Sequence, residues 1–243
     1  MRIPHVHKLG YESSEVIPEE TIKTFIDPQA YIDDIGLFDD KKEYLHWLIR
    51  TKLLIRHSIE YEDLIAFIKR KRGMNRCGIH PNMTMRDGHR IEAHHTPFVM
   101  EDILSIVTKK HLDRNESMKQ TDIMEEVMEL HHLGLVGLYG LCTLCHTLCH
   151  SDSGDSLFIP LENVYGNPEG FVDIYKPYMT ESLLAKWENV RILNQGYTMI
   201  KNILPLELQK KYIYIQNTSE ADKGHEMIST NRLAEFITDL DQL

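Results

Sequence analysis

The feature that most constrains this chain is a pair of short cysteine and histidine motifs that stand far apart in the sequence. The first motif is Cys77-Gly-Ile-His80 and the second is Cys142-Thr-Leu-Cys145. Structural zinc sites use four Cys or His ligands, usually supplied as two such closely spaced pairs. The two-residue gap lets both side chains of a pair point at one ion, and we expect Gly78 to ease the first turn with a positive φ. The motifs therefore predict one structural zinc ion on Cys77, His80, Cys142 and Cys145.

The alternative is that these cysteines are buried thiols and that His80 is an ordinary surface histidine, since free cysteine often packs as a small apolar residue. A disulfide framework is not expected, because the chain has only four cysteines and three of them lie in the segment LCTLCHTLC. Cys149 stands outside the four-ligand set. We expect it to be a packed thiol on a helix.

Length and composition place the chain among ordinary globular proteins. It has 243 residues, 42% of them hydrophobic and 26% charged, which is enough for one large or two small cores. No apolar run approaches the roughly 20 residues of a membrane span, and the polar start lacks a secretory signal. We therefore expect no membrane partner and a cytoplasmic location, meaning the host cytoplasm or the virion for a phage-encoded chain.

Charge is distributed unevenly along the chain. The formal net charge of -10 argues against a protein that coats nucleic acid non-specifically. Locally, a basic cluster precedes the first motif, and it could follow a nucleic-acid backbone. The alternative is a solvated helix end. The candidate nucleic-acid contacts are Lys69, Arg70, Lys71, Arg72 and Arg76, together with Arg90, which could hold a phosphate.

Periodicity predicts a mixed set of elements. Apolar residues at helical spacing predict helices over 41–57, 59–72, 99–112, 121–132, 182–197 and 230–240, with a short helix near 18–27. Turn residues and a short alternating run predict a knuckle and then a strand within 75–98. A short strand or tight turn is expected over 134–140, a turn running into a helix over 141–150, and a strand with a turn over 156–170.

Three regions are expected from this pattern. They are a mostly helical N-terminal region over 1–72, a metal-binding core over 73–155 with a helical insertion at about 99–132, and a mixed, mainly helical C-terminal region over 156–243.

A second group of histidines accompanies the two motifs. His94 and His95 end the predicted strand, and neighbouring strand residues point to opposite sides. His146 and His150 lie one helical turn apart, on one face of the helix that follows the second motif. The alternative for His94 and His95 is that their rings only pack or form hydrogen bonds within the strand.

The order of a zinc knuckle, then IEAHHTP, then LCTLCHTLCH resembles the HNH branch of the His-metal finger (ββα-metal) nucleases, over about residues 73–155. The resemblance implies an α+β fold, with a zinc-stapled ββα-metal core between helical N- and C-terminal extensions. It also implies that His94, His146 and His150 bind a catalytic Mg²⁺, Mn²⁺ or Zn²⁺ ion, and that His95 is the general base. The implied function is metal-dependent endonuclease cleavage of phosphodiester bonds, with DNA as the partner.

The chain departs from that family in two ways. The asparagine that usually braces the catalytic loop is replaced by residues of the segment 137–140, and two predicted helices are inserted between His95 and Cys142. Together with the acidic charge, these departures motivate an alternative function. The chain would then be a zinc-stabilised structural or interaction protein with a degenerate HNH fold and protein assembly partners, for example a component of a phage particle.

Overall fold

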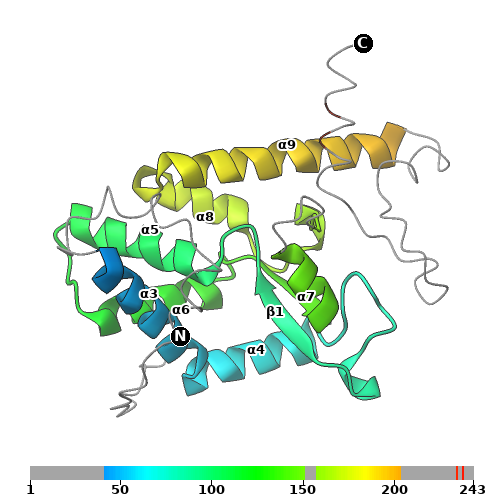
Figure 1. The fold of residues 1–243 in the computed structure, drawn as a ribbon, viewed down its shortest axis with the longest axis horizontal. Coiled ribbons are helices and arrows are strands. Elements are labelled where there is room, and N and C mark those ends of the chain that lie inside the picture. The colour runs from blue at the N-terminus through cyan, green and yellow to red at the C-terminus, as the bar shows by residue number, and fades with distance from the viewer. Residues whose placement is uncertain (1–40, 151–156, 204–233, 235–236, 238–243) are drawn as a thin grey trace. The chain divides into compact units, whose positions relative to one another are not determined.

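The computed structural model describes residues 41–150 and 157–203, together with Ala234 and Ile237. The helix expected near 18–27 lies outside these residues, as does nearly all of the helix expected over 230–240. The described residues form an α+β fold of helices with one two-stranded sheet (Figure 1). The elements are α3 (Lys41–Arg56), α4 (Ile59–Lys71), η1 (Met85–Asp87), β1 (Ile91–His95), α5 (Met100–Asp113), α6 (Gln120–His132), β2 (Leu138–Cys142), α7 (Thr143–Cys149), η2 (Leu161–Asn163), α8 (Pro168–Tyr175), η3 (Lys176–Tyr178) and α9 (Glu181–Ile203).

The chain divides into two compact units, and each is built from segments that are distant in the sequence. Unit 1 comprises Met1–Ala66, Phe98–Val136 and Pro168–Leu184, and unit 2 comprises Phe67–Pro97, Gly137–Asn167 and Ala185–Leu243. None of the helices in the described part of the chain is both long enough and apolar enough to cross a membrane.

Unit 1 is helical in its described residues and is organised around α5. Every residue of α5 from Met100 to Thr108 is buried, because α3, α6 and α8 all pack against this helix. Two of these buried residues are acidic, and both are compensated. The Asp102 carboxylate accepts a hydrogen bond from the Val99 backbone N–H at 2.9 Å, and Glu101 pairs with Lys52 of α3. Pairing of this kind removes most of the cost of burying a charge.

Unit 2 contains the sheet. β1 and β2 run antiparallel, with Ile91 opposite Cys142 and His94 opposite Tyr139. Helix α7 begins directly after β2 and lies against β1 (Figure 1). Because side chains alternate along a strand, Glu92 and His94 share one face of β1.

The two expected strands that follow His95 differ in outcome. The segment expected over 134–140 does form a strand, but β2 starts at Leu138 and runs on to Cys142. In place of the strand expected over 156–170, the described residues of this segment form isolated bridges, such as the one between Tyr165 and Leu138, and the short helix η2. Pro160 has no backbone N–H to donate, which disfavours a longer ladder there.

Candidate metal centre

The first cysteine motif folds into a tight loop held by its own backbone. The N–H of Cys77 donates to the carbonyl of Met83 at 2.9 Å, and the N–H of Met83 donates to the carbonyl of His80 at 2.8 Å. The N–H of Gly78 donates to the carbonyl of Gly140 in β2, also at 2.8 Å. These bonds fix the loop against the strand that leads into the second motif.

Gly78 is needed for a different reason from the one we expected. It does not have a positive φ, so the prediction from backbone conformation was wrong. A Cβ atom added to Gly78 would lie 2.2 Å from the ring of Tyr139. Lack of space beside this ring, and not backbone strain, disfavours a side chain at this position.

The two motifs meet in what we call the Cys/His site, formed by Cys77, His80, Cys142 and Cys145. One ligand-type atom from each residue lies within 4.8 Å of the other three, and all four residues are buried. His80 Nδ1 is 3.1 Å from Cys145 Sγ and 3.7 Å from Cys142 Sγ. Sulfur and nitrogen ligands of a tetrahedral zinc ion lie about 3.5 Å apart. The residues present, their burial and their spacing therefore fit a zinc ion.

The thiols of this site cannot all ionise by themselves. A hydrogen bond from Cys145 lowers the pKa of Cys77 to about 4. The same hydrogen bond, together with burial, raises the pKa of Cys145 far above its usual range, and burial also raises the pKa of Cys142. Cys142 and Cys145 thus hold protons that a divalent cation would displace.

An apolar shell surrounds the Cys/His site, and it includes Ile79, Ile91 and Leu141. Cys149 packs against this shell but does not belong to the four-atom group, as expected for a packed thiol. Burial raises the pKa of Cys149 to about 12, so it stays a thiol at neutral pH. The shell keeps water away from the site, which strengthens electrostatic interactions inside it.

A second cluster, the three-histidine site, forms from His94, His146 and His150. One ring nitrogen from each lies within 4.8 Å of the other two. His94 is buried, His146 is partly buried and His150 is exposed. The Glu92 carboxylate lies 3.0 Å from His146 Nδ1. We did not predict Glu92 from the sequence, although its position two residues before His94 on a strand was a signal that it would share this face.

His95 lies apart from both clusters. It is only 4% exposed and points to the side of β1 opposite His94. Among the described residues, no group of side chains that could hold a metal ion includes His95.

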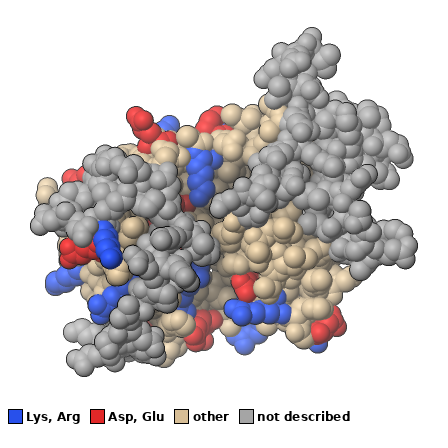
Figure 2. Space-filling view, in the orientation of Figure 1, with Lys and Arg blue, Asp and Glu red and all other residues tan. Residues whose placement is uncertain are grey.

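The predicted basic cluster is partly engaged within unit 2. Lys69 Nζ donates to the Ile91 carbonyl at 2.7 Å, Arg72 lies over the Tyr165 ring at 6.0 Å, and Arg90 pairs with Glu92 at 3.0 Å. The other three side chains, Arg70, Lys71 and Arg76, are exposed. On the face shown in Figure 2, the described Lys and Arg side chains are scattered among acidic and uncharged ones.

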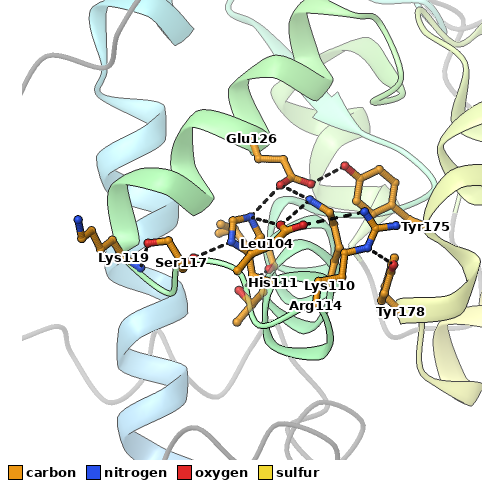
Figure 3. Close-up of polar contacts among 11 residues, drawn as sticks. Leu104, Lys110, His111, Arg114, Ser117, Lys119, Glu126, Tyr175 and Tyr178 are labelled. Carbon is orange, nitrogen blue, oxygen red and sulfur yellow. Dashed lines mark hydrogen bonds and ion pairs between the residues drawn. The ribbon is translucent and has the colours of Figure 1, made fainter.

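Unit 1 holds a third cluster of ligand-type residues, which we did not predict. His111, Glu116 and Glu126 bring their ligand-type atoms within 4.8 Å of one another. Figure 3 shows Lys110, His111 and Tyr175 directed at Glu126. Lys110 enters this cluster, with its Nζ atom 2.6 Å from Glu126 and 3.0 Å from Glu116. Tyr175 also donates a hydrogen bond to Glu126 at 2.6 Å. We call this arrangement the Lys110 network, and its positive charge comes from the chain itself.

Comparison with known proteins gives one result. The family model of the bacteriophage G278-like virion proteins matches residues 12–234. No curated protein and no solved structure matches the chain.

This family match corrects the predicted function. The endonuclease prediction, with its nuclease and hydrolase chemistry, was wrong, because the match describes proteins of the virion. The role of His95 as general base belonged to that prediction, and no observation tests it; a DNA partner gains no support. The error has a physical reason: metal-ligand spacing constrains a scaffold, whereas function depends on what the scaffold carries.

The alternative of a phage-particle component with protein assembly partners agrees with the match, which places the protein in the virion. Since the match spans far more than half of the 243 residues, the chain belongs to the family of bacteriophage G278-like virion proteins.

Proposed function

We propose that this protein is a structural component of the phage particle, in which a zinc ion on the Cys/His site fixes the fold of unit 2. The proposal rests on one combined observation: a chain that matches the virion family over residues 12–234 also contains a buried group of three cysteines and one histidine. The zinc ion would supply structural cross-linking.

The position of the ligands explains why such an ion would matter. Cys77 and His80 come from a loop without regular secondary structure of its own, whereas Cys142 ends β2 and Cys145 lies in α7. An ion bound to all four joins this loop to the sheet and the helix. Structural zinc in small domains contributes about 10–16 kcal/mol of apparent binding free energy, and binding is coupled to folding. The ion would therefore account for a large share of the stability of this region.

We also propose that the likeness to HNH proteins is one of scaffold alone. Supporting this are the antiparallel pairing of β1 with β2 and the start of α7 directly after β2, which together give a ββα order beside the Cys/His site. A scaffold of this kind can serve unrelated functions. In a particle protein it would serve to hold surfaces in place for neighbouring subunits.

The proposal is tested in particles. Cells that produce a phage lacking this protein would be supplied with the wild type, Cys145→Ser or Cys149→Ser, and particles would be purified on a density gradient. We expect mass spectrometry to find the wild type and Cys149→Ser in the particles, and the yield of particles to fall with Cys145→Ser. Absence of the wild-type chain from purified particles would contradict the structural role. Normal incorporation of a zinc-free Cys145→Ser protein would contradict the role of the ion.

A further inference from the structure

We propose that an exposed basic face of unit 2 binds the acidic segment, residues 12–40, of a second copy of this chain. The basic face is defined by six exposed side chains: Arg70, Lys71, Arg72, Arg76, Arg86 and Arg90. The proposal rests on the proposed function in one respect, because the particle is where copies of the chain would meet.

The basic face arises because two stretches of unit 2 lie side by side. One stretch is the end of α4 with the loop that follows it, and the other surrounds η1 and leads into β1. Lys69 Nζ donates a hydrogen bond to the Ile91 carbonyl at 2.7 Å, and Arg76 forms an antiparallel bridge with Thr84. These contacts hold the basic residues of both stretches in one region of the surface.

Unit 2 offsets little of this positive charge. Residues 64–91 contain seven Lys and Arg but only one acidic residue, Asp87, whose carboxylate accepts a hydrogen bond from the Thr84 hydroxyl at 2.6 Å. Among the described residues, Arg90 pairs with Glu92, whereas no ion pair involves the other five members of the basic face. Like charges gathered at a surface repel one another and attract an anionic partner.

The complementary charge is present in the same sequence. The acidic segment contains nine Asp and Glu residues and one Lys, which gives it a net charge of -8. It lies within the part of the chain that the virion-family model matches. An extended segment of this length spans at most about 100 Å, which exceeds the width of a typical domain. The acidic segment of one copy can therefore reach the basic face of a neighbouring copy.

Charge also favours this partner over nucleic acid. The whole chain carries a net charge of -10, which repels a polyanion at long range, and the family match gives a DNA partner no support. Carboxylates, in contrast, match the fork of donors on an arginine side chain. One basic face and one acidic segment on each copy form a head-to-tail contact, and contacts of this kind build rings or filaments.

The experiment is carbodiimide cross-linking of the full-length protein, prepared as an equal mixture of unlabelled and ¹⁵N-labelled copies. Carbodiimide joins a carboxylate to an amine only where the two are in contact, and Lys71 supplies an exposed amine within the basic face. We expect mass spectrometry to find Lys71 joined to Asp or Glu residues of the acidic segment in hybrid peptides, which carry one labelled and one unlabelled half. At about 1 M salt, where the Debye length is about 3 Å, the hybrid peptides should disappear.

Charge reversal tests whether the basic face causes the contact. Arg76→Glu combined with Arg86→Glu keeps the Lys71 amine and should lower the yield of hybrid peptides about tenfold, because several weak surface ion pairs are lost together. The matched control combines Arg50→Glu with Arg56→Glu. It changes two exposed residues of α3 and the net charge by the same amount, and it should leave the yield unchanged. Circular dichroism checks that both variants fold.

A charge swap adds a test that a merely structural effect would fail. Asp33→Arg and Asp34→Arg, added to the variant with Arg76→Glu and Arg86→Glu, should restore part of the yield. Hybrid peptides that are absent from the wild type, or cross-links whose two halves always carry the same label, would overturn the contact between copies. Binding of duplex DNA that requires Arg76 and Arg86, without any cross-link to the acidic segment, would assign the basic face to nucleic acid instead. Because purified protein is used, failure here is distinct from absence of the chain from particles, which would contradict the proposed function.

Discussion

Each of the two units of this protein contains a cluster of metal-ligand-type side chains, but the positive charge beside these side chains has a different source in each unit. In unit 1, Lys110 lies between Glu116 and Glu126 and supplies the positive charge that their carboxylates require. In unit 2, the Cys/His site brings together three sulfur atoms and an imidazole, and we propose that a zinc ion supplies the charge. A cluster of ligand-type residues therefore does not by itself identify a metal site. A basic side chain within the cluster can supply the positive charge that a metal ion would otherwise supply.

The directions of the pKa shifts follow the same division. Burial opposes ionisation of Glu126, but hydrogen bonds from Lys110, Tyr175 and His111 outweigh it and hold its pKa below the ordinary value. In the Cys/His site the pKa of Cys145 rises instead, because its proton is shared with Cys77 and the site is buried. In the Lys110 network the carboxylate of Glu126 is therefore ionised and paired within the chain. In the Cys/His site, Cys145 would lose its proton only when a cation binds.

The largest expected effect comes from breaking the Cys/His site. Cys145→Ser should remove the zinc and destabilise unit 2 by at least ~4 kcal/mol, the linkage contribution of an ion present at a thousand times its dissociation constant. Hydrogen exchange would show it as lost protection in the loop after Cys77 and in α7, with little change in α5. Cys149→Ser is the matched control and should keep its zinc. Equal zinc content in Cys145→Ser and the wild type would contradict the assignment.

Breaking the Lys110 network should cost somewhat less and should not depend on metal. Glu126→Gln removes the charge that Lys110, His111 and Tyr175 contact. Lys110 keeps Glu116 as a partner, so the cost comes from weakened hydrogen bonds to a charged group, each worth about 1.5–3 kcal/mol. Denaturant unfolding of unit 1, with and without a chelator, measures the loss. Glu125→Gln, on the same helix, should change stability by no more than about 0.5 kcal/mol. A chelator-dependent loss in Glu126→Gln would mean that this cluster also binds metal.

Acid should weaken unit 1 through His131. This side chain is buried, its Nδ1–H donates to the Val127 carbonyl, and burial lowers its pKa from 6.5 to about 4. The unfolded chain therefore binds a proton at a higher pH than the folded chain does, so stability falls as the pH drops from about 6.5 to about 4. The expected loss is ~3 kcal/mol from this shift.

Amide exchange in α6 as a function of pH, on chelator-treated protein, isolates this effect from metal release. His131→Gln should flatten the pH dependence between pH values of about 6.5 and 5, whereas the exposed neighbour change His132→Gln should preserve it. The same slope in both variants would show that His131 is not the group responsible.

The smallest expected effect concerns the contact between the first motif and β2. Gly78→Ala would force a methyl group against the Tyr139 ring, and overpacking of this kind costs about 1–3 kcal/mol. The melting temperature of the zinc-loaded protein measures the cost. In a Tyr139→Ala background the added cost of Gly78→Ala should largely disappear. An unchanged cost in that background would mean that the backbone, and not the ring, restricts Gly78.

The features that could be predicted from the sequence are those that a short segment of the chain encodes by itself. The pairing of Cys77 with His80, and of Cys142 with Cys145, was visible because metal ligands need fixed short spacings. Helices α3 to α6 were visible because apolar residues recur along each of them at helical spacing. The approach of the two motifs in the structure agrees with the expectation from their chemistry.

Other features depended on contacts that no short pattern contains. Glu92 reaches His146 only because β1 lies against α7, and Lys110 reaches Glu126 only because α5 packs against α6. Along the sequence, each of these residues looks like part of an ordinary charged surface. The preferred function, an endonuclease, was wrong for a related reason: the motifs predicted a metal-binding scaffold, and the family match concerns how the whole chain is used.

X-ray absorption at the zinc edge, on protein loaded with one equivalent of zinc, would show whether the Cys/His site binds the ion. Zinc on the Cys/His site should be surrounded by three sulfur atoms at about 2.3 Å and one nitrogen atom at about 2.0 Å. A first shell of nitrogen and oxygen alone, or failure of the protein to retain zinc after gel filtration, would contradict it.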